Sequence, residues 1–354
     1  MRIIPLDSVK GNEILAKDIV NNNNTTLIPS GTIMKKEYVT RLKELNIEFI
    51  YVEDELGEGI DLVDSLEMQI KDQCLENMKD ILLKYSYNNE TELQEIKAVA
   101  DDIIESILSN PEVIFNLSSI RSKSESIYSH SLNVCALSVL VAIKLKLKQE
   151  IIRNIAIGCL LHDIGFTYIT IDYQDLILDN CRQKEIIEIK KHVIYGYSAV
   201  ENMDWLSPIA KDIILNHHER NDGSGYPFRL TDKRIKIWSK IVAVCDEFDS
   251  RVYGNLTKKM KVHEAIDYIV SQAEVKFNLD VVDAFVASVA AYPTGALVMT
   301  NEGEIGIVLR QNPKCPTRPV IRIIQDINGD KPEIWTEKDL TKELTLFITD
   351  TILD

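Results

Sequence analysis

Two adjacent histidines, His217 and His218, open the segment NHHERNDGSGYP at residues 216–227. The chain has only six histidines, and five of them lie in its middle part beside acidic residues or on apolar faces. A single such histidine is usually a satisfied core residue, but five together require a joint explanation. Those five are His130, His162, His192, His217 and His218.

Two aspartates accompany these histidines in otherwise apolar sequence. Asp163 follows His162, and Asp246 lies within KIVAVCDEFD. A buried aspartate is costly unless it is paired or bound to a metal. Imidazoles with interleaved carboxylates suit Mn, Fe, Ni or Zn ions. Five histidines and two aspartates exceed the needs of one ion but suffice for two ions that share one carboxylate. A two-metal site is well suited to phosphoester hydrolysis.

The surrounding pattern predicts helices that end at these residues. The apolar run IAIGCLL delivers His162 and Asp163 at its C-terminal end, and Gly165 is a plausible cap of that helix. Ser207 and Pro208 form an N-cap and first-turn pair that opens another helix. On that helix His217 shares a face with apolar residues, and His218 is rotated by about 100° from it.

The periodicity divides the 354 residues into four expected parts: an α+β module (1–60), a helical connector (61–111), a helical domain (112–291) and a β extension (292–354). The expected fold is mainly α, with a small N-terminal α+β module and a C-terminal β-hairpin extension. That extension is expected to hold two hairpins, GALVMT with IGIVLR and PVIRIIQD with KPEIW. The connector helices are interpreted as packing elements, with signal transmission or a homodimer as the alternative.

Composition excludes some classes of function. The net charge of −15 makes binding of nucleic acid polymers unfavourable. The six cysteines form no C-x-x-C pair and are expected to be buried, reduced thiols. The N-terminus shows no signal-peptide pattern, and the longest apolar stretch is too short for a membrane span. These features predict a cytoplasmic protein without a membrane partner.

The order of these motifs resembles the HD-GYP subgroup of the HD phosphohydrolase superfamily, which are bacterial cyclic di-GMP phosphodiesterases. The resemblance spans roughly residues 120–290. The matching stretches are YSHSLNV, LLHDIG, HVIYGYSAV, NHHERNDGSGYP and VAVCDEFD. It implies an HD-type helical bundle and hydrolysis of cyclic di-GMP to linear pGpG, with further cleavage to GMP left open.

The resemblance also implies a ligand assignment for two divalent ions, Fe or Mn. One ion would be held by His130, His162, Asp163 and Asp246, and the other by His192, His217 and His218. Asp163 would bridge the two ions and is therefore the expected catalytic residue, with a hydroxide between the ions as nucleophile. Tyr226 would shape the mouth of the pocket, and His263 matches no motif.

The chain departs from the family pattern on the substrate side. Phe166 stands where the family has the lysine of HDIGK. Asn255 stands at the arginine of R-P-Y-K, while Lys258 keeps the lysine and Arg251 lies nearby. We therefore expect Tyr226, Arg251 and Lys258 to contact the substrate. Ser126 occupies the position of a third-metal glutamate, with Glu125 one residue away, so the register predicts two metals.

These departures leave three interpretations. The first is an active phosphodiesterase whose activity is reduced. The second is a catalytically weak or inactive receptor that keeps the metals and binds cyclic di-GMP, favoured by Phe166 and Asn255. The third is an HD phosphohydrolase for another nucleotide, which the GYP loop disfavours. If the missing lysine limits catalysis, Phe166→Lys should raise turnover; if Phe166 is packed, lysine would be buried without a partner.

Overall fold

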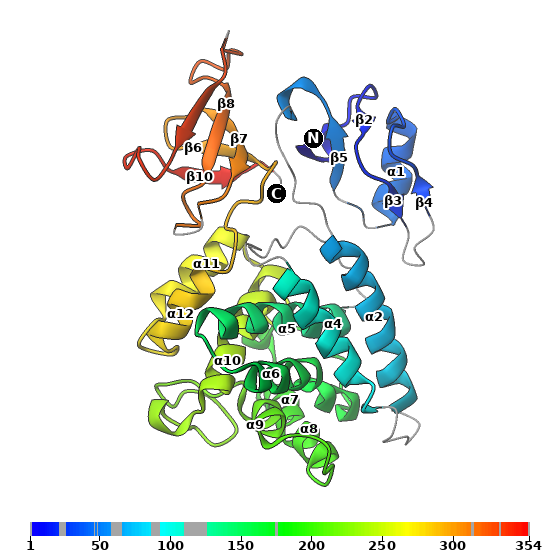
Figure 1. Cartoon of the computed structure of the whole chain (residues 1–354), viewed down its shortest axis with the longest axis vertical. Helices are drawn as coiled ribbons and strands as arrows, with labels where there is room; N and C mark the ends of the chain where they lie inside the picture. The colour runs from blue at the N-terminus through cyan, green and yellow to red at the C-terminus, as the bar shows by residue number, and fades with distance from the viewer. Residues whose placement is uncertain are drawn as a thin grey trace. The chain divides into compact units, whose positions relative to one another are not determined.

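The computed structural model describes residues 2–20, 26–45, 47, 49–57, 66–85, 93–109, 126–173, 176–312, 315–332 and 334–352 (Figure 1). The chain forms two compact units. One contains residues 1–64, 116–122 and 289–354, and the other contains residues 65–115 and 123–288. Most of the expected helical connector therefore packs with the helical domain. Glu125 lies outside the described residues.

The N-terminal module is a small antiparallel sheet with one helix. Strand β5 (Phe49–Glu53) lies between β1 (Arg2–Pro5) and β2 (Ile14–Leu15). A separate pair joins β3 (Ile19–Val20) to β4 (Thr26–Ile28). Helix α1 (Lys36–Glu44) contributes Leu42 to a core that also contains Leu6, Leu15, Met34 and Val52. The module thus has its own apolar core, as the α+β interpretation requires.

The C-terminal part is a five-stranded antiparallel sheet in the order β10-β6-β7-β8-β9. The first expected hairpin is confirmed as β6 (Leu297–Thr300) with β7 (Ile305–Arg310). The prediction for the second hairpin was partly wrong. Strand β8 (Val320–Gln325) pairs with β9 (Thr336–Asp339), not with KPEIW. Strand β10 (Ile348–Thr351), which the sequence pattern did not predict, pairs with β6.

Charge pairs across the sheet favour the observed position of β9. Glu337 on β9 lies 3.3 Å from Arg310 and 3.7 Å from Arg322. Lys338 lies 2.7 Å from Glu304. Opposite charges on neighbouring strands stabilise a register, whereas Pro332 in KPEIW has no N–H to donate to a ladder.

The helical unit carries the residues expected to do chemistry. Its α-helices are α2 (Leu66–Tyr85), α4 (Ile96–Ser109), α5 (Ser126–Lys144), α6 (Gln149–Leu161), α7 (Gln183–Lys190), α8 (His192–Val200), α9 (Pro208–Asn216), α10 (Ile237–Tyr253), α11 (Val262–Ser271) and α12 (Leu279–Val286). The expectation of a mainly α fold is confirmed.

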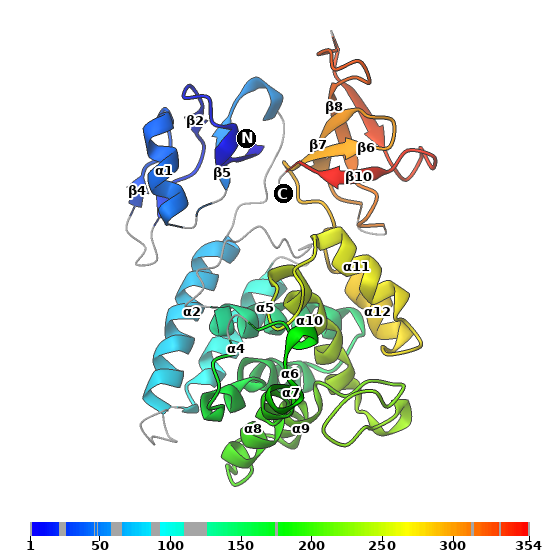
Figure 2. The same cartoon turned by 180° about the vertical axis from the view of Figure 1, so that it is seen from behind.

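Helix α6 lies at the centre of this unit, in contact with α4, α5 and α9. Every residue from Ile155 to Leu161 is buried, so the helix is apolar on all sides near its C-terminus. Helix α5 likewise is buried almost throughout from Ser129 to Ala142. Helices α2 and α4 run side by side, as both views show (Figures 1 and 2). Across the described residues, we find no helix that combines the length and apolarity needed to cross a membrane.

Candidate metal centre

Helix ends deliver most of the candidate ligands. His162 caps the C-terminus of α6 and Asp163 follows it, while His217 caps α9 and His218 follows. His192 is the first residue of α8. The expected start of α9 is confirmed, because the Ser207 side chain accepts a hydrogen bond from the Ala210 N–H and Pro208 is the first helical residue. His130 and Asp246 lie within α5 and α10.

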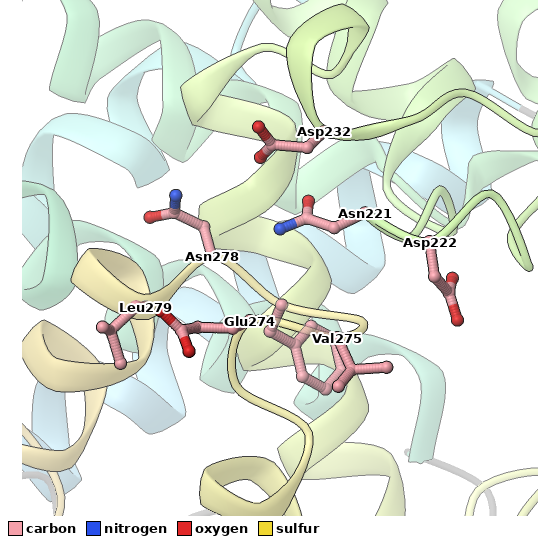
Figure 3. A pocket seen from close by; sticks show the side chains of 8 residues that line it. Asn221, Asp222, Asp232, Glu274, Val275, Asn278 and Leu279 are labelled. Carbon is pink, nitrogen blue, oxygen red and sulfur yellow. The ribbon is translucent and has the colours of Figure 1, made fainter.

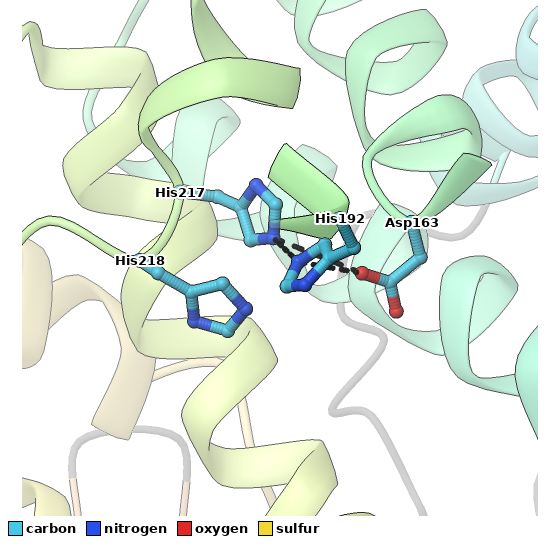
Figure 4. Close-up of side chains that lie close together, drawn as sticks. All are labelled: Asp163, His192, His217 and His218. Atoms are coloured by element: carbon cyan, nitrogen blue, oxygen red, sulfur yellow. Dashed lines mark hydrogen bonds and ion pairs between the residues drawn. The ribbon is translucent and has the colours of Figure 1, made fainter. Parts of the chain in front are cut away.

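All seven sequence-predicted ligands come together in the structure, in two groups. One group contains Asp163, His192, His217 and His218 (Figure 4), and the other contains His130, His162 and Asp246. Within each group the ligand atoms lie within 4.8 Å of one another. All seven residues are buried except His218, whose side chain is 20% exposed. His218 therefore faces the accessible side of the centre.

Asp163 lies between the two groups. Its Oδ2 atom is 3.3 Å from His162 Nε2 and 3.6 Å from His130 Nε2. Its Oδ1 atom is 3.6 Å from His192 Nε2 and 3.8 Å from His217 Nε2. Each carboxylate oxygen thus faces one group of imidazoles. This is the placement that a bridging ligand requires.

Main-chain carbonyls hold three of the imidazoles in one tautomer. The Nδ1 atoms of His162 and His192 each lie 2.7 Å from a carbonyl oxygen, those of Cys159 and Ile189. His217 Nδ1 lies 3.0 Å from the carbonyl of Ile213. A carbonyl only accepts, so Nδ1 donates in each case and the Nε2 lone pair is left for another partner.

A carboxylate that the sequence interpretation missed holds the fourth imidazole. Asp249 is fully buried, and its Oδ2 atom lies 2.6 Å from His130 Nδ1. The Asn133 amide donates to its other oxygen at 2.8 Å. Asp249 lies three residues after Asp246 on α10, so the spacing in DEFD was the available signal. Such a partner orients a ligating histidine and raises its basicity.

The electrostatics of the cluster fit bound cations. Burial, reinforced by neighbouring His162 and His192, lowers the pKa of His217 to about 3, so its imidazole is neutral. Burial would also lower the pKa of His130, but Asp246 and Asp249 outweigh it and raise the value to about 10.

The imidazoles also approach one another closely. The Nε2 atoms of His162 and His130 are 3.3 Å apart, and those of His192 and His217 are 3.4 Å apart. Asp163 Oδ1 is buried without a hydrogen-bond donor. Imidazole nitrogens that converge at this separation around a buried carboxylate oxygen without a donor form an arrangement that a bound cation would satisfy.

Close backbone packing sets the position of His192. A Cβ atom on Gly165 would lie 1.8 Å from the His192 carbonyl oxygen and 2.7 Å from the Gly196 nitrogen. The interpretation of Gly165 as a helix cap was wrong: it lies within a 3₁₀ helix (Ile164–Tyr168), and its φ is not positive. Glycine is required because the chain after Asp163 passes directly against α8.

The Phe166 ring packs on one face of the His192 imidazole. It is 7% exposed, and its ring stacks on the His192 imidazole with centroids 4.2 Å apart and planes inclined by 13°. Tyr173 packs on Phe166 at 4.5 Å. An aromatic column therefore stands where the resemblance expects a cation. This favours the packed alternative for Phe166.

The loop that contains Gly225, Tyr226 and Pro227, called the GYP loop, packs against the group that includes His218. Tyr226 stacks on His218, with ring centroids 4.7 Å apart and planes inclined by 23°. The buried carboxylate of Glu219 accepts hydrogen bonds from the N–H groups of Phe228 and Leu230, at 2.7 and 2.8 Å. A Cβ atom on Gly225 would lie 2.5 Å from the His218 carbonyl oxygen. The loop is thus fixed with Tyr226 beside the cluster, where the sequence placed it.

The other two expected substrate residues are placed differently. Arg251 lies 2.7 Å from Glu247, and its guanidinium is 3.5 Å from the centroid of the Tyr268 ring. Arg220 is paired with the same Glu247 at 2.8 Å. Lys258 is exposed after the end of α10, and the structure records no contact between it and the seven candidate ligands. Arg251 thus already pairs with a carboxylate, which it shares with Arg220.

A separate hollow of about 600 Å³ lies elsewhere in the helical unit (Figure 3). Acidic and amide side chains surround it, including Asp222, Asp232, Glu274 and Asn278. None of the seven candidate ligands lines it. The histidine cluster, rather than this hollow, therefore combines the residue types that chemistry would need.

Comparisons with known proteins agree with this geometry. Residues 112–281 match the model of the HD domain. Residues 297–353 match the KOW domain associated with HD domains, which places that module on the five-stranded sheet.

Known relatives of this chain are named as phosphodiesterases. The chain is 32% identical over 238 residues to cyclic di-GMP phosphodiesterase PA4108 of Pseudomonas aeruginosa, covering 66% of this chain and 56% of that protein. It is 34% identical over 163 residues to a cyclic di-GMP phosphodiesterase of Thermotoga maritima, covering 45% and 43%. The chain thus spans about half the length of these relatives.

A solved structure shares the fold of most of this chain. Bd1817, an HDG"Y"P protein from Bdellovibrio bacteriovorus, superposes with a TM-score of 0.55 and 19% sequence identity, covering 80% of this chain and 97% of that one. The HD-GYP resemblance drawn from the motifs is confirmed.

Proposed function

We propose that this chain hydrolyses cyclic di-GMP to linear pGpG with two divalent metal ions, Fe or Mn. The observation that carries the proposal is the position of Asp163, whose two oxygens face two separate groups of imidazoles. One group offers His130, His162 and Asp246 to an ion, and the other offers His192, His217 and His218. Relatives that are named cyclic di-GMP phosphodiesterases support the choice of substrate.

The bound ions would withdraw charge from the phosphoryl oxygens and lower the pKa of water at the site. The chain's own residues supply the rest of the arrangement. Asp249 and the three main-chain carbonyls fix the ring orientations, so the Nε2 atoms need no rearrangement on binding. Tyr226 stacks on His218 at the accessible side, where the substrate would enter.

A receptor with little or no turnover is the second candidate. The observation that favours it is the stacking of Phe166 on His192, because an aromatic ring fills a position beside the ligands without supplying positive charge. The loss of one charge-assisted phosphate contact costs about 1.5–3 kcal/mol. Such a loss slows an enzyme by roughly tenfold to a hundredfold without abolishing its activity.

Turnover and binding assays on the full chain separate the two candidates. Protein reconstituted with Mn²⁺ or Fe²⁺ is incubated with cyclic di-GMP, and the products are separated by anion-exchange chromatography. We expect pGpG from the wild type and none from Asp163→Ala. The analogue 3′3′-cGAMP, which has adenine in place of one guanine, serves as a comparison, because two relatives from Vibrio cholerae are named as 3′3′-cGAMP-specific phosphodiesterases.

Each outcome of these assays decides between the functions. Binding of cyclic di-GMP without product would establish the receptor. Preferential cleavage of 3′3′-cGAMP would replace the proposed substrate. Neither binding nor cleavage of either dinucleotide by fully metallated protein would overturn the proposed function.

A further inference from the structure

The substrate of the proposed function carries two phosphodiester groups, of which only one is cleaved at a time. The inference below rests on that proposed function. Each group bears one negative charge, and the cluster itself contains the carboxylates Asp163 and Asp246. The phosphate that does not react lies across the dinucleotide ring from the reacting one and so away from the ions that hold it. A cation placed outward from the ligand cluster would attract this second negative charge.

The two arginines near Asp246 cannot readily serve this purpose. Arg220 and Arg251 both pair with Glu247, at 2.8 and 2.7 Å. Arg220 is also buried and donates to the carbonyls of His217 and Glu219. Both guanidinium groups share Glu247, and that of Arg251 also stacks on the Tyr268 ring, so recruiting either arginine would break contacts that it already makes.

Lys190, unlike the two arginines, lies beside the GYP loop without a carboxylate partner among the described residues. It is the last residue of α7, it is exposed, and its ammonium lies 5.0 Å from the centroid of the Tyr226 ring. Tyr226 in turn stacks on His218 at 4.7 Å, so the lysine lies one aromatic ring outward from a candidate ligand. Among the described residues, we find no carboxylate within ion-pair distance of Lys190. The neighbouring Lys191, by contrast, pairs with Glu188 at 2.8 Å.

We propose that Lys190 binds the phosphate of the cyclic dinucleotide that is not being cleaved, with Tyr226 as the spacer between the two phosphate positions. The ammonium is a compact donor on a flexible stem, so it can leave the tyrosine face and meet an oxygen of the ligand. Because Tyr226 separates it from His218, Lys190 contributes to substrate affinity rather than to bond cleavage. Lys190 is thus a determinant of specificity for a ligand with two phosphates.

A pair of substrates tests this role. Cyclic di-GMP carries the second phosphate, whereas bis(p-nitrophenyl) phosphate carries only the reacting one. In Lys190→Gln at full metal content, we expect KM for cyclic di-GMP to rise about three- to tenfold. Its kcat, and all kinetic constants for bis(p-nitrophenyl) phosphate, should be unchanged. Lys190→Arg should restore the KM for the dinucleotide.

Lys191→Gln is the matched control, because it removes the same charge one residue away from a lysine that already has a partner. We expect its KM for cyclic di-GMP to stay at the wild-type value. Added salt should raise the wild-type KM more than that of Lys190→Gln, since an exposed contact is screened.

Three results would overturn the inference. Lys190→Gln could match the wild type on cyclic di-GMP, or it could lose activity on both substrates equally, which would indicate a role in folding or in the reacting centre. Lys191→Gln could also have the same effect as Lys190→Gln. A wild type that cleaves bis(p-nitrophenyl) phosphate but neither binds nor cleaves cyclic di-GMP would instead refute the proposed function on which the inference rests.

Discussion

At the scale of single residues, the position of Asp163 makes the sharpest prediction. Because its two oxygens face both groups of imidazoles, Asp163→Ala should lose both ions. His192→Ala removes a ligand from one group only and should mainly lower the occupancy of one ion. Elemental analysis of the purified variants measures this, with His263→Ala as a control outside the cluster. Full metal content in Asp163→Ala would refute the bridging role.

Asp249 should act on metal affinity through His130. Replacing its carboxylate by an amide weakens the hold on His130 Nδ1 while keeping the side-chain shape. We expect Asp249→Asn to bind the ion of that group about ten- to a hundredfold more weakly, as is typical when the partner of a ligating histidine is removed. Competition with a chromogenic chelator gives the affinity. An unchanged value would mean that Asp249 serves only the packing of α10 on α5.

Phe166→Lys tests whether a cation is tolerated beside His192. The ring that lysine would replace is buried and stacked on the imidazole, so we expect a lower melting temperature and a lower occupancy of the His192 ion, without a gain in turnover. Phe166→Leu removes the stack without adding charge and separates the two effects. A folded Phe166→Lys protein with two ions and faster turnover would show that the missing lysine limits catalysis.

At the scale of elements, the contact between the chain after Asp163 and α8 permits no added atom. Gly165→Ala places Cβ 1.8 Å from a backbone oxygen, and backbone cannot yield as a side chain can. We expect a loss of about 3 kcal/mol or more in the free energy of unfolding, measured by urea denaturation. Gly158→Ala meets the flexible end of Ile213 at 2.8 Å and should cost less. The reverse order would mean that α8 shifts freely.

Some features of the fold and of the site could be predicted from the sequence, and others depend on contacts between distant elements. The cluster of candidate ligands could be predicted because histidines and aspartates at helix ends carry a recognisable chemistry and order. For Asp249 the sequence offered only its spacing from Asp246, because its role depends on α10 packing against α5. Strand β10 could not be predicted, because its partner β6 lies some fifty residues earlier and nothing local specifies the pairing. The error at Gly165 has the same origin, since a tight approach between elements leaves no local signal.

At the scale of the whole molecule, metal binding should couple to stability. Ions held by the folded cluster would be released from the unfolded chain, so their removal should lower the melting temperature. We expect chelator-treated protein to melt several degrees lower and to recover as Mn²⁺ is added back, as followed by calorimetry. Asp163→Ala provides the control and should show little response to added Mn²⁺. An equal response in both proteins would place the stabilising ions outside the cluster.

The hydrogen bonds that hold the imidazoles have a consequence for how this centre can change over generations. His162, His192 and His217 are anchored by main-chain carbonyls, and no point substitution deletes a carbonyl. His130 alone among these four is anchored by a side chain, that of Asp249. Inherited variation can therefore adjust the electron donation of one ligand while the other three stay constant. A lineage that adapts to a different metal supply would be expected to vary first at residue 249.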